Sequence, residues 1–377
     1  MAQHATAGCL SAGVWTQFAD AKPNQIAPDR LFGDLARRRV VLLGEVHDNE
    51  DHHRWQLQTI AALHALHPKL VLGFEMFPRR LQSVLDRWTA GKLSTAEFLE
   101  RSEWRTVWGQ EPQLYLPIFE FARMNRIPMI ALNVDRKLVT TVGEKGWAQI
   151  PADQRAGITD PAPAPPAYLE LLHQSYGEHA TRDGKATADA DLDNPAFHRF
   201  VDSMLLWDRA MAQGIAQATK QDDGALVVAL MGSGHVQQGF GVPRQLVDLG
   251  VSDAAVLLPA ETSASCEDLD DHSATALFGI DARDDAEQVE RPRLGVALDQ
   301  TDERVRVQRV LDGSIAQQAG LRADDVIETI AGEHVSKVDE VIAAVGRQAP
   351  GTWLPIVVRR GNDTTEIIAR FPPRSRR

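Results

Sequence analysis

Cysteine and tyrosine are scarce in this chain, which has two cysteines and three tyrosines among 377 residues. Two cysteines close at most one bridge, so the sequence excludes a small fold held together by a disulfide framework. Cys9 and Cys266 could form that bridge outside the cytosol, or remain two inert thiols inside it. The sequence leaves both alternatives open.

Long apolar runs and an excess of positive charge are also missing. The longest apolar runs, such as residues 226–231, are about a third of the roughly 20 residues that a membrane-spanning helix needs, so we expect no transmembrane segment. Lys and Arg number 40 against 52 Asp and Glu, a net charge of −12. So acidic a chain is repelled by a phosphate backbone, and we expect no nucleic acid among its partners.

The amino-terminal end carries no export signal of its own. Ala7-Gly8-Cys9 is similar to a bacterial lipoprotein cleavage box, but neither a basic nor an apolar segment precedes it. Either the protein is cytoplasmic, or its true start lies upstream and it is periplasmic or membrane-associated. We treat residues 1–29 as an amino-terminal extension.

Five short apolar runs without polar alternation predict strands that are buried on both faces. Segments with helical spacing lie between them, which predicts a predominantly parallel sheet covered by helices, an α/β domain over residues 30–260. The runs are 40–44, 70–74, 128–132, 226–231 and 254–258.

The interval between the third and fourth strands is too long for one crossover. It contains a proline-rich stretch at 161–166 and then a polar stretch at 181–194. We therefore expect an inserted helical lid over about residues 147–220.

An acidic block follows the α/β domain. Residues 261–290 contain ten acidic residues and one basic residue, Arg283. A block of like charge with few aromatic residues is typical of a solvated segment. We expect an acidic linker at 261–290 and the domain boundary within it.

Short strand-like runs broken by Gly and Asp make up residues 291–373, and this part resembles a small β-rich PDZ domain. The resemblance implies a binding module that takes a peptide or protein C-terminus as an added strand, with loop amides holding the carboxylate. It rests on Leu294, Gly295 and Val296 as the carboxylate-binding loop, then on Gly313-Ser314-Ile315-Ala316, Asp324-Asp325-Val326-Ile327 and Pro350-Gly351.

Polar residues gather at the predicted carboxyl ends of four strands. Parallel strands place those ends along one sheet edge, where α/β proteins bind ligands. They are Glu45 and His47 after the first strand, Glu75 after the second, Asn133 and Arg136 after the third, and His235 after the fourth.

Two kinds of chemistry suit such a set. His47, Glu75 and His235 could hold a divalent metal ion that activates water. Alternatively, a carboxylate could act as general base while Arg136 steadies developing negative charge. His52 and His53 begin the following helix, and because neighbouring helical side chains point about 100° apart, we expect one to face the site and the other to be solvated.

The motifs resemble the superfamily that unites the Tiki, TraB, erythromycin esterase and ChaN families, and the ChaN branch fits best. The resemblance covers roughly residues 30–260. It rests on Gly44-Glu45-Val46-His47, Glu75-Met76-Phe77, Trp108-Gly109, Tyr115-Leu116-Pro117-Ile118, Ala131-Leu132-Asn133, Trp207-Asp208 and Gly232-Ser233-Gly234-His235.

The ChaN resemblance implies an iron-linked, haem-binding protein of the bacterial envelope with a tyrosine as axial ligand. Tyr168 and Tyr176 lie in the expected lid and are the candidate ligands, with His173 and His179 as alternatives, whereas we expect Tyr115 to be packed. Asp208 is a candidate for orienting a site residue. A homodimer is among the expected assemblies.

Two other functions stay open. The Tiki and erythromycin esterase resemblance implies a metal-dependent peptidase or esterase that uses the paired Gly-x-x-His motifs. The α/β domain could also be a non-catalytic interaction scaffold. A PDZ domain beside it favours a polypeptide partner, because a tethered tail has a raised effective concentration.

Overall fold

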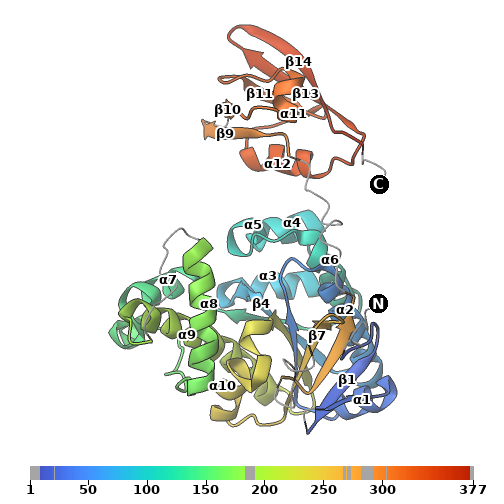
Figure 1. Cartoon of the computed structure of the whole chain (residues 1–377), viewed down its shortest axis with the longest axis vertical. Coiled ribbons are helices and arrows are strands. Elements are labelled where there is room, and N and C mark those ends of the chain that lie inside the picture. Colours follow the sequence, from blue (N-terminus) through green and yellow to red (C-terminus); the bar gives the residue numbers. More distant parts are fainter. Residues whose placement is uncertain are drawn as a thin grey trace, which may run out of the picture. The chain divides into compact units, whose positions relative to one another are not determined.

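The computed structural model describes residues 9–20, 22–182, 192–265, 269, 273–281, 293–302 and 304–373. The chain forms two compact units, Met1–Ala282 and Arg283–Arg377, which are described separately below (Figure 1). None of the described helices combines the length and apolar character needed to cross a membrane.

An eight-stranded sheet forms the centre of the first unit, in the order β2-β1-β8-β7-β3-β6-β4-β5. Neighbouring strands from β8 to β5 pair in parallel, and only β1 and β2 add antiparallel pairs at one edge. The strands are β1 (Trp15–Ala19), β2 (Lys22–Gln25), β3 (Val40–Glu45), β4 (Leu70–Pro78), β5 (Met129–Asn133), β6 (Leu226–Gly232), β7 (Ala254–Glu261) and β8 (Ala276–Ile280).

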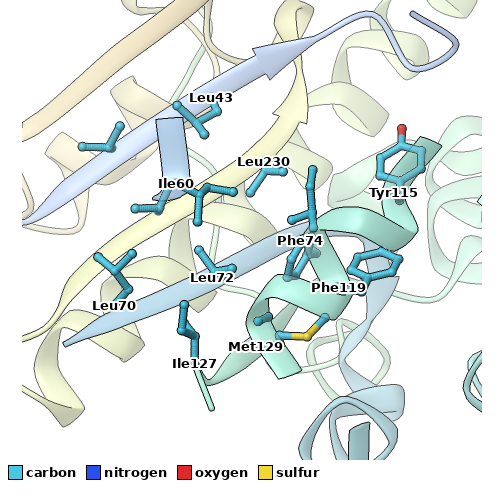
Figure 2. Close-up of a cluster of buried hydrophobic side chains, with 14 of the residues drawn as sticks. Leu43, Ile60, Leu70, Leu72, Phe74, Tyr115, Phe119, Ile127, Met129 and Leu230 are labelled. Atoms are coloured by element: carbon cyan, nitrogen blue, oxygen red, sulfur yellow. The ribbon is translucent and has the colours of Figure 1, made fainter. Parts of the chain in front are cut away.

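The central strands are apolar on both faces because helices cover both. Every residue of β3 and β6 is buried. Leu43, Phe74 and Leu230 face one apolar cluster, shown with Tyr115 and Phe119 in Figure 2. The alternate residues, such as Leu42 and Met231, face a second cluster. The prediction of a mainly parallel, helix-covered sheet is confirmed.

The helices follow the strands in the expected alternation. Asn49 ends the loop after β3, and its side chain accepts hydrogen bonds from two backbone N–H groups of α2, which fixes where that helix begins. The helices are α1 (Pro28–Leu35), α2 (Glu50–Leu66), α3 (Gln82–Thr89), α4 (Thr95–Arg101), α5 (Trp104–Val107), α6 (Pro112–Met124), α7 (Arg136–Lys145), α8 (Pro166–Arg182), α9 (Pro195–Gln221) and α10 (Val242–Asp248).

Helix α9 belongs to both the expected lid and the sheet. Phe197 and Val201 in its first half pack with Tyr168 and Leu172 of α8. Its second half packs against the sheet through residues such as Ile215. One 27-residue helix therefore connects the lid to the domain core (Figure 1).

The expected extension and linker are wrong in part, because both contribute strands to the sheet. β1 and β2 lie within residues 1–29, and β8 lies within residues 261–290, where it pairs with β7 and β1. The apolar run of β8 is only five residues long and stands among acidic ones, so the charge count over the whole segment hid it. Cys9 is disulfide-bonded, and its expected partner, Cys266, lies outside the described residues.

The second unit is an antiparallel sheet with two helices. Its strand order is β14-β13-β11-β10-β9, with β12 paired to β11, and its apolar core includes Leu294, Val305 and Ile356. The elements are β9 (Val296–Thr301), β10 (Arg304–Val310), α11 (Ile315–Ala319), β11 (Val326–Ile330), β12 (Glu333–His334), α12 (Val338–Gly346), β13 (Trp353–Arg360) and β14 (Asp363–Arg370).

We predict that Gly279→Ala destabilises the first unit by about 2 kcal/mol or more, because overfilling a packed position forces backbone shifts. A Cβ at Gly279 would lie 2.1 Å from the backbone oxygen of Ser11. Gly33→Ala is the control, since a Cβ there meets nothing within 4 Å and alanine favours a helix over glycine. Denaturant unfolding of both variants measures the difference, and an equal stability would show that β8 does not pack as described.

Candidate functional site

The candidate site lies at the carboxyl edge of the central parallel strands. Glu45 is the last residue of β3 and stands beside Gly232, the last residue of β6. Glu75 lies in β4, on the other side of β6. His235 follows β6 in a short 3₁₀ turn, Ser233–His235. The sheet thus brings together side chains that are up to 190 positions apart in sequence.

The Glu45 carboxylate is buried and surrounded by donors. Its Oε1 accepts from Tyr115 Oη at 2.6 Å and from His47 Nδ1 at 2.9 Å. Its Oε2 accepts from Gln56 Nε2 at 2.9 Å and lies 3.4 Å from His53 Nδ1. Burial opposes ionisation, but the hydrogen bonds from His47 and His53 hold the pKa of Glu45 well below its usual range.

His47 is the one histidine of this group that reaches solvent, with 36% of its side chain exposed. Its ring packs edge-on against Trp108, with 4.6 Å between the centroids. Burial alone would lower the pKa of His47, but the bond to Glu45 and the charge of Glu75 raise it above 6.5. The Glu45 bond fixes Nδ1 as a donor, so any proton exchange with a ligand falls to Nε2.

Gly232 allows His47 and Glu75 to approach the same strand end. A Cβ at Gly232 would lie 3.0 Å from His47 Cε1 and 3.2 Å from His47 Nε2. The Gly232 N–H donates to Glu75 Oε2 at 2.7 Å. The glycine therefore anchors the carboxylate while leaving room for the imidazole.

His235 lies between two carboxylates and is buried. Its Nδ1 is 2.7 Å from Asp208 Oδ1, and its Nε2 is 3.5 Å from Glu75 Oε1. Tyr168 Oη donates to the other Asp208 oxygen at 2.8 Å. Burial disfavours the charged ring, but Glu75 and Asp208 raise the pKa of His235 to about 10. Burial also raises the pKa of Asp208 and, together with Asp208, that of Tyr168.

Both histidines at the start of α2 are buried, so the expectation that one of them is solvated is wrong. His53 Nε2 donates to the His47 carbonyl at 3.1 Å, and its Nδ1 faces Gln56 and Glu45. His52 Nδ1 accepts from the Val46 N–H at 2.9 Å. The loop after β3 folds back over the helix start, so helical spacing alone misplaces the second ring.

The third strand contributes less than expected. Asn133 is buried and donates from Nδ2 to the Glu75 backbone oxygen at 3.0 Å, so it supports the strand rather than the carboxylate. Arg136 is exposed at the start of α7, and no hydrogen bond or ion pair joins it to Glu45, Glu75 or His235. The expected role for Arg136 at the site finds no support in its placement.

The three tyrosines differ in what their hydroxyls do. Tyr115 and Tyr168 are fully buried. The Tyr115 hydroxyl donates a hydrogen bond to Glu45, and the Tyr168 hydroxyl donates one to Asp208. Tyr168 therefore cannot face a haem iron while it holds Asp208. Tyr176 is half-buried on α8 and packs on the rings of Phe197 and Phe200. Among the described contacts, the Tyr176 hydroxyl has no bond to a buried carboxylate, in contrast to the hydroxyls of Tyr115 and Tyr168.

His173 shares this aromatic surface, with its ring 5.2 Å from that of Phe197, whereas the side chain of His179 lies outside the described residues. Sequence analysis missed that Tyr115 belongs to the strand-edge site, because its Leu-Pro motif indicates only packing. A buried tyrosine opposite a buried glutamate is visible only in three dimensions.

The divalent metal expected at His47, Glu75 and His235 finds no support in the placement of these side chains. Within the described ranges, no group of three or more His, Cys, Asp or Glu side chains is placed to hold a metal ion. Metal-bound histidines need one unprotonated nitrogen directed at the ion. His235 Nδ1 lies 2.7 Å from Asp208 Oδ1, and its Nε2 lies 3.5 Å from Glu75 Oε1.

The expected peptide-binding loop of the second unit leads into its outermost described strand. Leu294 is buried in the core, and Val296 begins β9, which pairs only with β10 in the described part of the sheet. The carbonyls of Leu294 and Gly295 accept from Ala316 and Leu311. These bonds hold the loop against α11 and leave β9 as an edge.

Comparisons with known proteins agree with this fold. A family model described as "Haem-binding uptake, Tiki superfamily, ChaN" matches residues 31–246, and a PDZ-domain model matches residues 292–369. The structure of cofacial heme binding to ChaN of Campylobacter jejuni is 17% identical, covers 71% of this chain and 98% of its own, and has a TM-score of 0.53, which shows a shared fold.

A curated plant protein is also similar. Protein RETICULATA-RELATED 5, chloroplastic, of Arabidopsis thaliana is 24% identical over 229 residues, which are 58% of this chain and 30% of the relative. The chain thus spans less than a third of that relative's length. Because the family model covers more than half of the 377 residues, the chain belongs to the haem-binding uptake, Tiki superfamily, ChaN family, and it carries a carboxyl-terminal PDZ domain.

Proposed function

We propose that this protein binds haem on its lid, with Tyr176 as the axial ligand, and recruits a partner through its PDZ domain. One observation carries the proposal: Tyr176 is the tyrosine whose hydroxyl is not given to a buried carboxylate, and it stands beside the rings of Phe197 and Phe200. Aromatic rings suit the flat face of a porphyrin. The family match supports the same ligand class.

The residues of this surface fit a haem, and they would contribute in different ways. Phe197 and Phe200 offer an apolar surface for the macrocycle, and His173 is the alternative donor at the same surface. A bound haem would supply an iron that tyrosinate ligates. We place the function in the bacterial envelope, where an iron-linked uptake protein would meet its ligand.

Haem titration of the full chain should give a Soret band that Tyr176→Phe shifts and weakens, with affinity reduced about tenfold or more through loss of the iron–phenolate bond. Gln174→Ala, an exposed change on the same helix, is the control and should titrate like the wild type. An unchanged band in Tyr176→Phe together with a changed band in His173→Ala would instead assign the ligand to His173.

Ester or peptide hydrolysis is a second candidate function, favoured by the half-exposed His47 held by a buried carboxylate. In its neutral form, His47 would take a proton from water at Nε2, while Glu45 holds Nδ1. The resulting hydroxide would attack the carbonyl carbon, and the leaving alcohol or amine would take the proton back as the acyl bond breaks. Glu75 and the buried His235 would border this reaction.

If this activity exists, kcat/KM for an activated ester should rise with pH and reach half its maximum above pH 6.5. The reason is that the pKa of His47 is raised above 6.5 and only the neutral ring accepts a proton. His47→Gln should lower kcat/KM about 100-fold or more, and His334→Gln, an exposed histidine of the PDZ domain, should not. An acid limb at or below pH 6.5, or turnover unchanged in His47→Gln, would contradict this mechanism.

We expect the PDZ domain to bind a partner that has a free C-terminus. In the described part of the sheet, β9 is an edge strand next to α12, and a peptide can pair with such an edge as an added strand. An apolar C-terminal peptide should bind the full chain at least tenfold more tightly than the same peptide with an amidated end, since amidation removes the charge that the Leu294-Gly295-Val296 loop would hold. Fluorescence anisotropy of both peptides measures the ratio. Equal affinities would assign binding to strand addition alone.

A further inference from the structure

A chain of buried hydrogen bonds joins the lid to the site at the carboxyl edge of the sheet, which contains Glu75 and His235. Tyr168 of α8 donates to Asp208 of α9, and the second oxygen of Asp208 lies 2.7 Å from His235 Nδ1. The exposed fractions of the three residues are 1%, 0% and 7%. A buried donor or acceptor that loses its partner costs far more than an exposed one, so the three side chains hold their positions together.

Asp208 determines how the His235 ring is oriented. The Asp208 contact at Nδ1 directs the other ring nitrogen, Nε2, toward Glu75 Oε1, which lies 3.5 Å away. The backbone packs closely around this contact: a Cβ at Gly241 would lie 2.4 Å from the His235 carbonyl oxygen and 3.0 Å from Asp208 Oδ1. The ring and the carboxylate have little room to relax separately.

Apolar side chains also pack between α8 and α9. Leu172 packs with Phe197 and Val201. Apolar contacts are not directional, so they dock the helix without fixing any group at the strand edge. The Tyr168 hydroxyl adds the directional link.

We propose that Tyr168 and Asp208 form a latch through which docking of lid helix α8 sets the position of His235, and through His235 that of Glu75. Both are positioning residues that act through His235. The latch goes beyond haem binding and does not require it. When α8 lifts, Asp208 loses the hydrogen bond from Tyr168, and water reaches the contact between Asp208 and His235.

Amide hydrogen exchange and imidazole NMR of the full chain without haem test the latch. Tyr168→Phe keeps the ring and removes the hydroxyl, so exchange in α8 should become about five- to tenfold faster, as expected from loss of one buried hydrogen bond. The Nδ1–H proton of His235 should exchange faster in the same variant. Gln174→Ala, a change at an exposed residue of the same helix, is the control and should change neither rate.

A second variant separates a latch from a purely structural tyrosine. Asp208→Asn retains an acceptor for Tyr168 but can no longer offer a charged oxygen to His235, so the ¹⁵N signals of the His235 ring should move toward those of a neutral ring. Faster α8 exchange in Tyr168→Phe with an unchanged His235 proton would overturn the coupling. Equal effects in Tyr168→Phe and Gln174→Ala, or unchanged ring signals in Asp208→Asn, would overturn it as well.

Discussion

The burial of Glu45 at the end of β3 is the constraint on which the rest of the site depends. A carboxylate taken out of water is costly unless each of its oxygens is paired, and here donors come from three elements: His53 and Gln56 of α2, Tyr115 of α6, and His47 of the intervening loop. These elements cannot shift independently without leaving a donor or the carboxylate unpaired. The carboxylate thus holds the covering helices and His47 in one arrangement.

The charges at the strand edge balance one another. The three buried carboxylates are Glu45, Glu75 and Asp208, and each contacts at least one histidine. A buried carboxylate or imidazole would otherwise lose its charge by gaining or losing a proton. Contact between carboxylates and histidines favours the charged forms of both. His235 is enclosed on both sides, whereas His47 keeps an exposed edge. The same network therefore contains a buried ring, His235, that stabilises the fold, and a partly exposed ring, His47, that a ligand can reach.

The parallel sheet and the place of the site follow from local patterns, whereas the pairings within the site do not. Uninterrupted apolar runs predict buried parallel strands, and parallel strands align their carboxyl ends, so Glu45, Glu75 and His235 were predictable neighbours. β8 was not, because five apolar residues carry less signal than the acidic residues around them. The sequence predicts packing for Tyr115 and a haem-ligand role for Tyr168, but not their carboxylate partners, since the partner of a hydroxyl depends on how helices far apart in sequence cross.

The lid and the strand edge cannot be treated as separate sites, because α8 contributes to both. Tyr176, on the aromatic surface proposed for haem, follows Tyr168 by eight residues, about two helical turns. Under the proposed latch, a ligand that moves α8 at Tyr176 would also change the contact between Tyr168 and Asp208. Binding free energies linked through one element are reciprocal. If the proposed latch couples a ligand of the lid to a ligand at His47 and Glu75, each ligand changes the affinity for the other by the same factor.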